Sequence, residues 1–400
     1  MPLTGLPLAV FVFTTTPARK KVSLCARACN SPHIHRHCTA STAAIFAMAP
    51  TKEELERRRI VGVEEERVSN VTSTDFPGHY PGEDHTWNLE EFRKKLKIQI
   101  HKANDLDYEF DLIGVDASIA NAFRRILISE VPTLAIETVF VHNNTSIVQD
   151  EVLAQRLGLV PLRGDKKGFQ HLRWLKKNPD EPAVEATDFN TIVMGLKVAC
   201  TRNHATPATE TDPEKLYFNS SVYARDIKFQ PQGRQSDWFS GAGEIRPVNP
   251  DILLAKMRPG QEIDIEMHCV LGIGQDHAKF SPVATASYRL LPSIKIKQPI
   301  TGEDAEKFIN CFPKGVAEIQ TDKKTGQKKA VIVNPRKDTV SREVLRHEEL
   351  KGKVELGRIR DHFIFSIEST GMYHSDELFL QAVQILKKKC VDFHEKLLES

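Results

Sequence analysis

Apolar and polar residues alternate along five widely separated segments of the chain. A period of two places every second side chain on one face of an extended strand, so this alternation predicts half-buried β-strands. The five segments are Leu96–Ile100, Ile192–Cys200, Ile263–Leu271, Ile294–Ile296 and Phe363–Ile367. Long connections, several of them rich in proline and glycine, separate these segments, so the predicted strands come from distant parts of the sequence.

A first helix is predicted between Asp116 and Val131. Asp116 suits the N-cap position, and Pro132 disfavours the helical conformation in the residue before it, which ends the helix near Val131. The apolar positions that share one side of this helix are Ile119, Ala122, Phe123 and Ile126.

A second helix begins at Ser375, where Asp376 and Glu377 suit the positive end of the helix dipole, and continues almost to the C-terminus. Its apolar positions follow one another at intervals of 4, 3, 4, 3 and 4 residues: Phe379, Val383, Leu386, Cys390, Phe393 and Leu397. The average of about 3.5 residues keeps one seam turned toward a neighbouring helix. We call these six residues the C-terminal seam.

Two interpretations of this seam remain open from its spacing. It lies on the sheet of its own chain, as most amphipathic helices do, or it packs against a second chain. Both hold if one flank meets the sheet and the other meets the partner. Lys387, Lys388 and Lys389 lie beside the seam and are expected to be solvated.

Charge is unevenly distributed along the chain. The whole sequence has a formal charge of +2, from 55 Lys and Arg against 53 Asp and Glu. Residues 1–47 contain five basic side chains and no acidic one, so the remainder has 50 basic against 53 acidic residues, a formal charge of −3. Direct binding to nucleic acid requires a basic surplus, which the body lacks, so little direct contact is expected. No apolar stretch approaches the ~18 residues of a membrane-spanning helix.

The leader, residues 1–47, allows three interpretations. An acid-free segment that contains arginine is typical of a mitochondrial presequence. The second interpretation is a metal site, because the leader contains six possible ligands: Cys25, Cys29, His33, His35, His37 and Cys38. These residues lack the paired spacing of a zinc finger. We favour the third, in which Met48 is the true start and the leader is disordered or absent from the mature protein. Residues 48–90, rich in turn signals, are expected to form an irregular arm.

Several arrangements that suggest independent chemistry fail on inspection. A nucleotide-binding loop needs a third glycine and a helix that begins after it, and neither follows Gly272 and Gly274. Four acids alternate with aromatic residues, Asp105, Asp107, Glu109 and Asp111, but no glycine turn closes an ion cage, so a solvated face is expected. The cysteines beyond the leader, Cys200, Cys269, Cys311 and Cys390, lie far apart, as free buried thiols do.

The segment Arg258–Gln261 has proline and glycine at its centre, which predicts a type II turn.

Two blocks resemble the signature of a known family. The stretches Val115–Pro132 and Asp150–Leu162 are similar to the alpha family of RNA polymerase subunits. A third block, His277–Val283, resembles the branch of that family found in nuclear and archaeal enzymes. The blocks Phe308–Val316 and Asn334–Arg342 resemble the branch shared by polymerases I and III. The region from Cys200 to Cys269 contains no Cys-x-x-Cys motif, whereas some relatives have a zinc or iron–sulfur loop there. The resemblance covers about residues 60–400.

The resemblance implies an α+β fold and a non-catalytic role. The expected dimerisation domain, an antiparallel sheet with two main helices, is split between residues 91–139 and 286–400, and an inserted strand-rich domain covers 140–285. The two helices would pair with a smaller alpha-like subunit, and this heterodimer would organise the second-largest and other subunits of polymerases I and III, in the nucleus and nucleolus. No cofactor or metal is expected. The alternatives are an independent nucleic-acid or chromatin adaptor and, third, a small-molecule enzyme.

Arg124 and Arg125 are adjacent in the first helix, so their side chains point about 100° apart and cannot both face a core. From spacing alone, both are solvated or at least one binds an external carboxylate or carbonyl. The resemblance assigns both arginines a contact with the second-largest, catalytic subunit.

Overall fold

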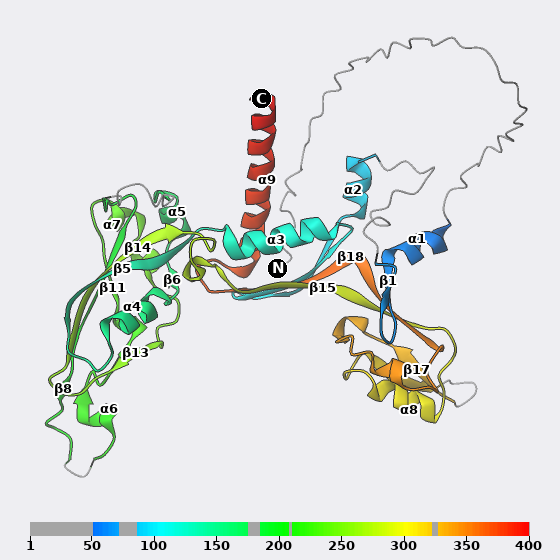
Figure 1. The fold of residues 1–400 in the computed structure, drawn as a ribbon. Coiled ribbons are helices and arrows are strands. Elements are labelled where there is room, and N and C mark those ends of the chain that lie inside the picture. Colours follow the sequence, from blue (N-terminus) through cyan, green and yellow to red (C-terminus); the bar gives the residue numbers. More distant parts are fainter. Residues whose placement is uncertain (1–50, 72–85, 175–184, 208–209, 322–326, 400) are drawn as a thin grey trace, which may run out of the picture. The chain divides into compact units, whose positions relative to one another are not determined.

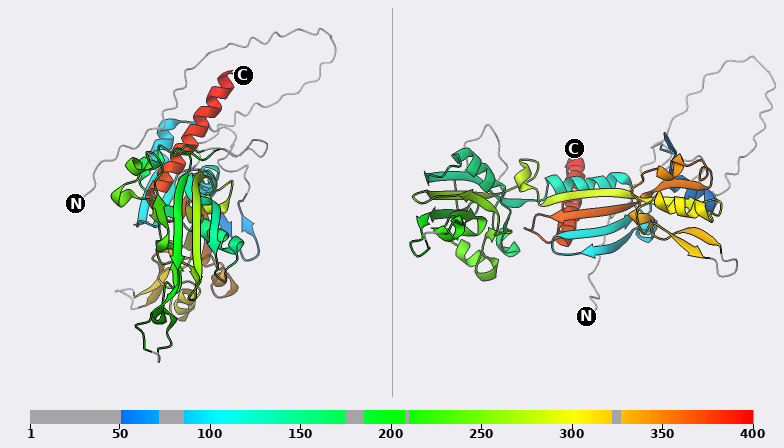
Figure 2. Two further views of the ribbon diagram at one scale, coloured as in Figure 1. Left: turned by 90° about the vertical axis from the view of Figure 1, so that its left-hand side faces the viewer. Right: turned by 90° about the horizontal axis from the view of Figure 1, so that it is seen from below.

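The computed structural model describes residues 51–71, 86–174, 185–207, 210–321 and 327–399 (Figures 1 and 2). The leader therefore lies outside the described residues, and the interpretations of it stay predictions. Within the described ranges, no helix combines the length and the apolar character that crossing a membrane requires.

The main sheet has six antiparallel strands, and the predicted α+β class is confirmed. The strands are β1 (Ile60–Val63), β2 (Val68–Ser69), β3 (Lys97–Ala103), β4 (Asp107–Ile113), β15 (Val283–Ile296) and β18 (Val354–Ser369). The long strand β18 pairs along its length with β15, and on its other edge with β1 and then β4. β3 pairs with β4 and forms the edge of the sheet. The predicted strands at 294–296 and 363–367 lie within β15 and β18.

Two helices cover one face of this sheet, as predicted. Helix α3 (Ala117–Ser129) begins at Asp116, whose side chain accepts a hydrogen bond from the Ser118 amide. Helix α9 (Ser375–Glu399) begins at the expected residue. The two helices pack on each other, α3 also contacts β15, and α9 contacts β4 and β18. Phe110, Leu112, Phe363 and Phe365 of the sheet are fully buried in this layer.

The predicted irregular arm is wrong for the part of residues 48–90 that the structure describes. Helix α1 (Lys52–Arg59) leads directly into β1, which joins β18 of the main sheet. Arg59 anchors this arm because its Nε and Nη2 atoms donate to the Asp361 carboxylate at 2.7–3.0 Å. A second helix, α2 (Leu89–Lys95), precedes β3.

A second antiparallel sheet occupies the middle of the chain, with the order β11-β7-β14-β5. Its strands are β5 (Thr133–Asn144), β7 (Ile192–Ala199), β11 (Lys228–Gln230) and β14 (Glu262–Gly272). The alternation predicted for β7 and β14 is confirmed, since Ile192, Met194, Ile263 and Ile265 are buried. The expected domain boundary at residue 140 falls inside β5, which pairs with β14 from Thr133 onward. A division of the chain at 140 would therefore cut a strand.

Short elements surround this second sheet. The helices are α4 (Asp150–Gly158), α5 (Lys166–Phe169), α6 (Pro213–Leu216), α7 (Gln235–Trp238), and the 3₁₀ turns η1 (Ala224–Asp226), η2 (Gly241–Gly243) and η3 (Ala278–Phe280). The strands are β6 (Leu162–Arg163), β8 (Thr201–Arg202), β9 (Tyr217–Phe218), β10 (Ser221–Tyr223), β12 (Arg246–Pro247) and β13 (Leu253–Lys256). The predicted type II turn is present: the Gln261 amide donates to the Arg258 carbonyl, and Gly260 has a φ of +89°.

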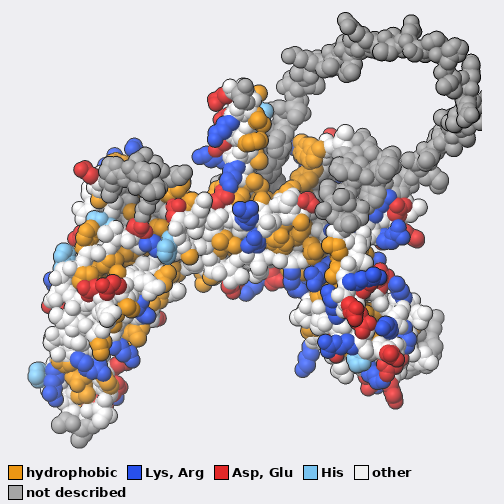
Figure 3. Space-filling model, viewed as in Figure 1, with side chains coloured by type: hydrophobic (Ala, Val, Ile, Leu, Met, Phe, Trp, Pro, Cys, Tyr) orange, Lys and Arg blue, Asp and Glu red, His pale blue; other side chains and the backbone are white. Residues whose placement is uncertain are grey.

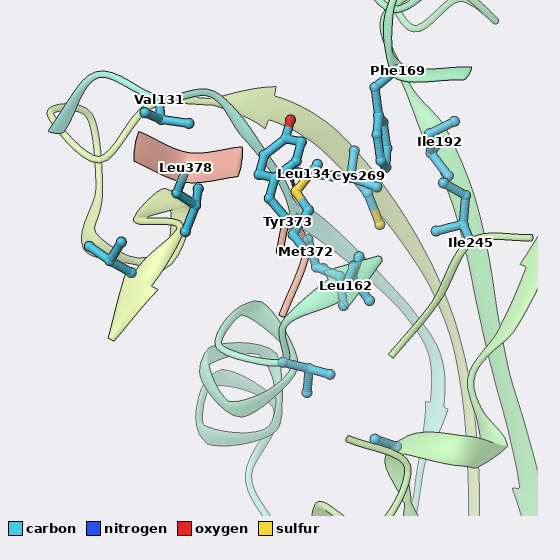
Figure 4. Packing of buried hydrophobic residues seen from close by; sticks show 14 of the residues in the cluster. Val131, Leu134, Leu162, Phe169, Ile192, Ile245, Cys269, Met372, Tyr373 and Leu378 are labelled. Carbon is cyan, nitrogen blue, oxygen red and sulfur yellow. Dashed lines mark hydrogen bonds between the residues drawn. The ribbon is translucent and has the colours of Figure 1, made fainter. Parts of the chain in front are cut away.

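The loop between β18 and α9 packs against the start of β5 and so joins the two sheets, as Figure 4 shows around Leu134, Met372 and Tyr373. The Tyr373 hydroxyl donates to the Pro132 carbonyl at 3.1 Å, and burial raises the pKa of Tyr373 to about 12, so the hydroxyl stays protonated. Lys279 donates to the Ile136 carbonyl at 2.7 Å and pairs with Glu137. The block His277–Val283 thus contacts β5 of the second sheet through Lys279.

Residues 297–353 form a satellite with its own core, which the sequence analysis did not anticipate. It contains α8 (Glu303–Asn310), β16 (Ala317–Thr321), β17 (Lys328–Ile332), η4 (Pro335–Lys337) and η5 (Glu343–Arg346). Its buried residues include Ile300, Ala305, Phe308 and Ala330, which pack with Val354 and Leu356 of β18. Both blocks that resemble the polymerase I and III branch lie in this satellite.

The expectation of a solvated acidic face on 105–111 is wrong for Asp111. Asp105 is exposed, but Asp111 is only 4% exposed. The Asp111 carboxylate pairs with Arg336, which reaches it from η4, and with His362 at 2.9 Å and His101 at 3.2 Å. Arg336 also pairs with Glu109 at 2.5 Å. Burial favours the neutral form, but hydrogen bonds from His362 and Arg336 outweigh it and hold the pKa of Asp111 below its usual value.

Candidate subunit interface

The first half of α9 is anchored in the core of its own chain. Leu378, Phe379 and Ala382 are buried. The ring of Phe379 lies 4.6 Å from that of Phe110 and 5.2 Å from that of Phe123, measured between centroids. These contacts fix the direction in which the helix leaves the sheet.

The second half of α9 has no such support. Every residue from Lys387 to Glu399 is exposed, a helical segment of about 20 Å at 1.5 Å per residue. Figure 3 shows hydrophobic side chains along one side of this segment. Phe393 is 65% exposed and Leu397 is 59% exposed. The same seam that begins in the core therefore continues into solvent.

The ten residues predicted at the interface fall into three groups. Phe123, Ile126 and Phe379 are buried in the core of the chain. Ile119, Ala122, Val383 and Leu386 are half-buried. Cys390, Phe393 and Leu397 are exposed. The two interpretations of the seam thus apply to different halves of one helix: its first half meets the sheet and its second half is open. The expectation of buried thiols is confirmed for Cys200, Cys269 and Cys311 and is wrong for Cys390, which is exposed because it lies on the open half of α9.

Sequence reasoning missed further exposed apolar residues beside this surface. On α9 they are Leu380, Val391 and Leu398, and on α3 the residue is Ile128. They lie off the 3.5-residue seam, so its period could not identify them.

The strand β3 is present as predicted, but the expectation that it is half-buried is wrong. Ile98 is 44% exposed and Ile100 is 59% exposed. They pair with Leu112 and Phe110 of β4, so they lie on the helix-bearing face of the sheet. They are exposed because β3 is the edge strand, while α3 and α9 pack mainly on β4, β15 and β18.

The two arginines of α3 differ in their surroundings. Arg124 is half-buried, and its Nε and Nη2 atoms donate to Asn121 Oδ1 at 3.1 and 3.0 Å. Arg125 is exposed, and its guanidinium makes no hydrogen bond or ion pair in the part of the chain that the structure describes. Near the end of α3, Glu130 pairs with Lys389 of α9. Lys389 is therefore exposed but paired, while Lys387 and Lys388 are exposed as predicted.

These features define a class of protein. A sheet whose two helices share a core, and whose second helix carries its apolar seam beyond that core, presents a surface for another polypeptide rather than a pocket for a small molecule. Among the described residues, no three His, Cys, Asp or Glu side chains are grouped to hold a metal ion.

Comparison with known proteins agrees with this class. Residues 109–390 match the model of the RNA polymerase Rpb3/Rpb11 dimerisation domain. The chain belongs to this family.

Among its relatives, subunit RPAC1 of DNA-directed RNA polymerases I and III from Saccharomyces cerevisiae is 55% identical over 82% of this chain and 96% of its own length. The Homo sapiens protein of the same name is 49% identical over 88% of this chain and 98% of its own length. RNA polymerase II subunit rpb3 of Dictyostelium discoideum is 30% identical over 78% of this chain and 98% of its own length. The resemblance to the polymerase I and III branch is confirmed.

Proposed function

We propose that the chain is a non-catalytic assembly subunit of DNA-directed RNA polymerases I and III. It pairs with a smaller alpha-like subunit, and the heterodimer organises the two largest, catalytic subunits. The relatives named for polymerases I and III are 40–55% identical to the chain, against 30% for the polymerase II relative, which supports this branch. In this role the chain serves transcription of ribosomal RNA and of small RNAs such as 5S and transfer RNA, in the nucleus including the nucleolus.

The observation that carries the proposal is the open half of the C-terminal seam, on α9. Exposed Phe393 and Leu397 continue a seam that starts from buried Phe379. Apolar side chains of this size gain free energy when another surface removes them from water. A stable interface of standard size buries about 800 Å² of each partner, and obligate interfaces are larger. The smaller subunit therefore covers this half of α9 together with the half-buried part of α3.

The domain division follows from the same arrangement. We assign the split dimerisation domain to the main sheet with α2, α3 and α9, and we move the start of the inserted domain from 140 to Thr133, where β5 begins. The inserted domain ends before β15. Residues 297–353 are then a satellite of the dimerisation domain.

An independent nucleic-acid or chromatin adaptor is not supported. The relatives are named as polymerase subunits, and the body carries a formal charge of −3. Affinity purification of the tagged chain from cells, with partners identified by mass, tests the choice. The smaller alpha-like subunit and the largest subunits of polymerases I and III should be recovered in near-equal amounts. Recovery of chromatin proteins without polymerase subunits would contradict the proposal.

We assign the contact with the second-largest subunit chiefly to Arg125. Its exposed guanidinium has no partner among the described residues, so it is available to a carboxylate or carbonyl, whereas Arg124 is held by Asn121. Arg125→Glu should weaken binding of the second-largest subunit to the preformed heterodimer about 10-fold or more, because a paired interface charge contributes ~2–5 kcal/mol. Binding of the smaller subunit should not change. Quantitative co-purification measures both.

The matched control is Lys388→Glu, which makes the same charge change at an exposed position of α9. Equal loss of the second-largest subunit in both variants would assign the effect to net charge and remove Arg125 from the contact.

A further inference from the structure

A group of aromatic rings lies open on the inserted domain, where α5 and α7 pack on each other. Figure 1 shows these two helices at the same end of the second sheet. The rings of His171 and Trp238 are stacked, with centroids 4.9 Å apart and planes 20° apart, and the ring of Phe189 lies 5.4 Å from that of Trp238. Phe189 is 40% exposed, His171 is exposed and Trp238 is half-buried. The three rings therefore form one continuous group at the surface.

Two guanidinium groups accompany these rings. The guanidinium carbon of Arg173 lies 5.9 Å from the centroid of the Phe189 ring, and that of Arg234 lies 6.0 Å from the Trp238 ring. Both arginines are exposed, and neither guanidinium makes a hydrogen bond or an ion pair in the described part of the chain. We call His171, Arg173, Phe189, Arg234 and Trp238 the stacking surface.

Buried contacts hold the elements that carry the stacking surface. Gln235 of α7 is fully buried, and its side-chain amide donates to the carbonyls of Asp188 and Thr191 at 2.8 and 2.7 Å. Phe169, the last residue of α5, and Phe239, which follows α7, are buried with their rings 5.4 Å apart. The open rings are thus fixed in place before any ligand binds, which lowers the entropic cost of binding.

The charges near the stacking surface decide which ligand suits it. Three acidic residues are close in sequence to its members: Glu185, Asp188 and Asp237. The local charge is therefore nearly balanced, and attraction of phosphate groups alone would be weak. The surface instead offers open aromatic faces beside guanidinium planes, on which unpaired nucleobases of any identity stack. A duplex does not offer its base faces in this way.

We propose that the stacking surface binds single-stranded RNA. This inference rests on the proposed function, because the product of an RNA polymerase is single-stranded RNA. Successive bases stack on the rings of Phe189 and His171, and Arg173 and Arg234 contact the phosphates between them. The formal charge of −3 on the body is compatible with this mode, since stacking needs few cations. Attachment to the polymerase raises the local concentration of the transcript, so a weak site is sufficient.

Fluorescence anisotropy of a labelled RNA, titrated with the purified heterodimer, tests the proposal. The RNA is an unstructured strand of about 12 nucleotides, within the usual size of single-strand sites. Phe189→Ala with His171→Ala should weaken binding at least about 5-fold, the effect of losing one stacked base. An RNA duplex of the same length should bind at least about 5-fold more weakly than the single strand to the unchanged heterodimer.

The matched control is Phe218→Ala with His204→Ala. It removes the same two side-chain types from exposed positions of the inserted domain outside the stacking surface, and Phe218 is 56% exposed. The control should bind RNA as tightly as the unchanged chain. Circular dichroism spectra of both variants should match that of the unchanged chain, because all four side chains are exposed.

The salt dependence gives a second readout. Each cation that contacts a phosphate of a single strand contributes about −0.7 to the slope of log affinity against log salt concentration, so Arg173→Gln with Arg234→Gln should make the slope about 1.4 shallower. Arg202→Gln with Lys256→Gln, at exposed positions of the same domain, should leave it unchanged. The basic leader is present in every variant, so its contribution cancels in these comparisons.

The outcomes separate this proposal from the proposed function. If the heterodimer forms but the ring variant binds RNA as tightly as its control, or the duplex binds as well as the single strand, the RNA site is wrong while the assembly role stands. Loss of another polymerase subunit from the ring variant, with RNA affinity unchanged, would assign the surface to a protein and also overturn the site. If no heterodimer forms, the proposed function fails, and the same titration with the full chain alone still decides the RNA site.

Discussion

Phe393→Asp combined with Leu397→Asp should abolish pairing with the smaller alpha-like subunit while leaving the chain folded. Both side chains are exposed in the isolated chain, so the substitutions remove no contact of its core. In the heterodimer each contributes ~1.5–3 kcal/mol by leaving water, and two buried carboxylates add a desolvation cost. The dissociation constant should therefore rise by about 100-fold or more. Isothermal titration with the purified smaller subunit measures it.

The matched control is Gln384→Asp with Lys388→Gln. This pair also lies four residues apart on α9 and also changes the net charge by −2, but it points away from the seam. The control should pair with the smaller subunit normally. Equal affinity of the two variants would show that the seam is not at the interface, and a loss of helix content in the first variant alone would assign its effect to unfolding of α9.

Asp111→Ala should destabilise the folded chain by ~3–5 kcal/mol, the cost of removing one partner from a buried ion pair. The substitution removes the buried carboxylate partner of the Arg336 guanidinium, whose side chain is 15% exposed, and leaves it only the more exposed Glu109 of β4. His362 loses its 2.9 Å partner at the same time. Urea unfolding of the heterodimer, followed by circular dichroism, measures the change in the free energy of unfolding.

The same strand supplies the control for this prediction. Asp107 pairs with Lys102 at 2.8 Å, and both side chains are well exposed. Asp107→Ala should cost ~1 kcal/mol or less, because exposed ion pairs contribute little. If both alanine variants lose the same stability, the buried network around Asp111 has no special role in holding the satellite to the sheet.

The pH dependence of stability follows from the lowered pKa of Asp111. A carboxyl whose pKa is lower in the folded than in the unfolded state binds fewer protons when folded, so its contribution is complete above the unfolded pKa. The contribution disappears as the pH falls through the folded pKa. The unfolding free energy of the Asp111→Asn variant should therefore depend less on pH in the acid range than that of the unchanged chain. An unaltered acid dependence would contradict the assignment.

Much of the fold was predictable because local signals agree with the tertiary structure. Asp116 caps α3 as its type predicts, and the alternation in 192–200 and 263–271 gives the buried faces of β7 and β14. The motifs at 115–132 and 150–162 identified the family, which the comparisons confirm.

The expectations that were wrong concern the burial of residues, which depends on contacts between residues that are distant in the sequence. Asp111 is buried because Arg336, 225 residues away in sequence, covers it, and no local pattern could supply that partner. The alternation at 96–100 predicts a strand but cannot say whether a helix covers its apolar face. The period of the C-terminal seam is uniform, although only its first half has a sheet beneath it. In each case the sequence specifies the element and the tertiary structure decides its burial.

Hydrogen exchange over residues 387–399 tests the central claim most directly. In the isolated chain no residue of this half of α9 is buried, and the Lys389–Glu130 ion pair that links it to α3 is partly exposed, so its amides should exchange quickly, whereas those near Phe379 should exchange slowly. On adding the smaller alpha-like subunit, the amides of 387–399 should slow by at least about 10-fold while those near Phe379 change little. Exchange over 387–399 that is equally fast with and without the partner in a formed heterodimer would contradict the account.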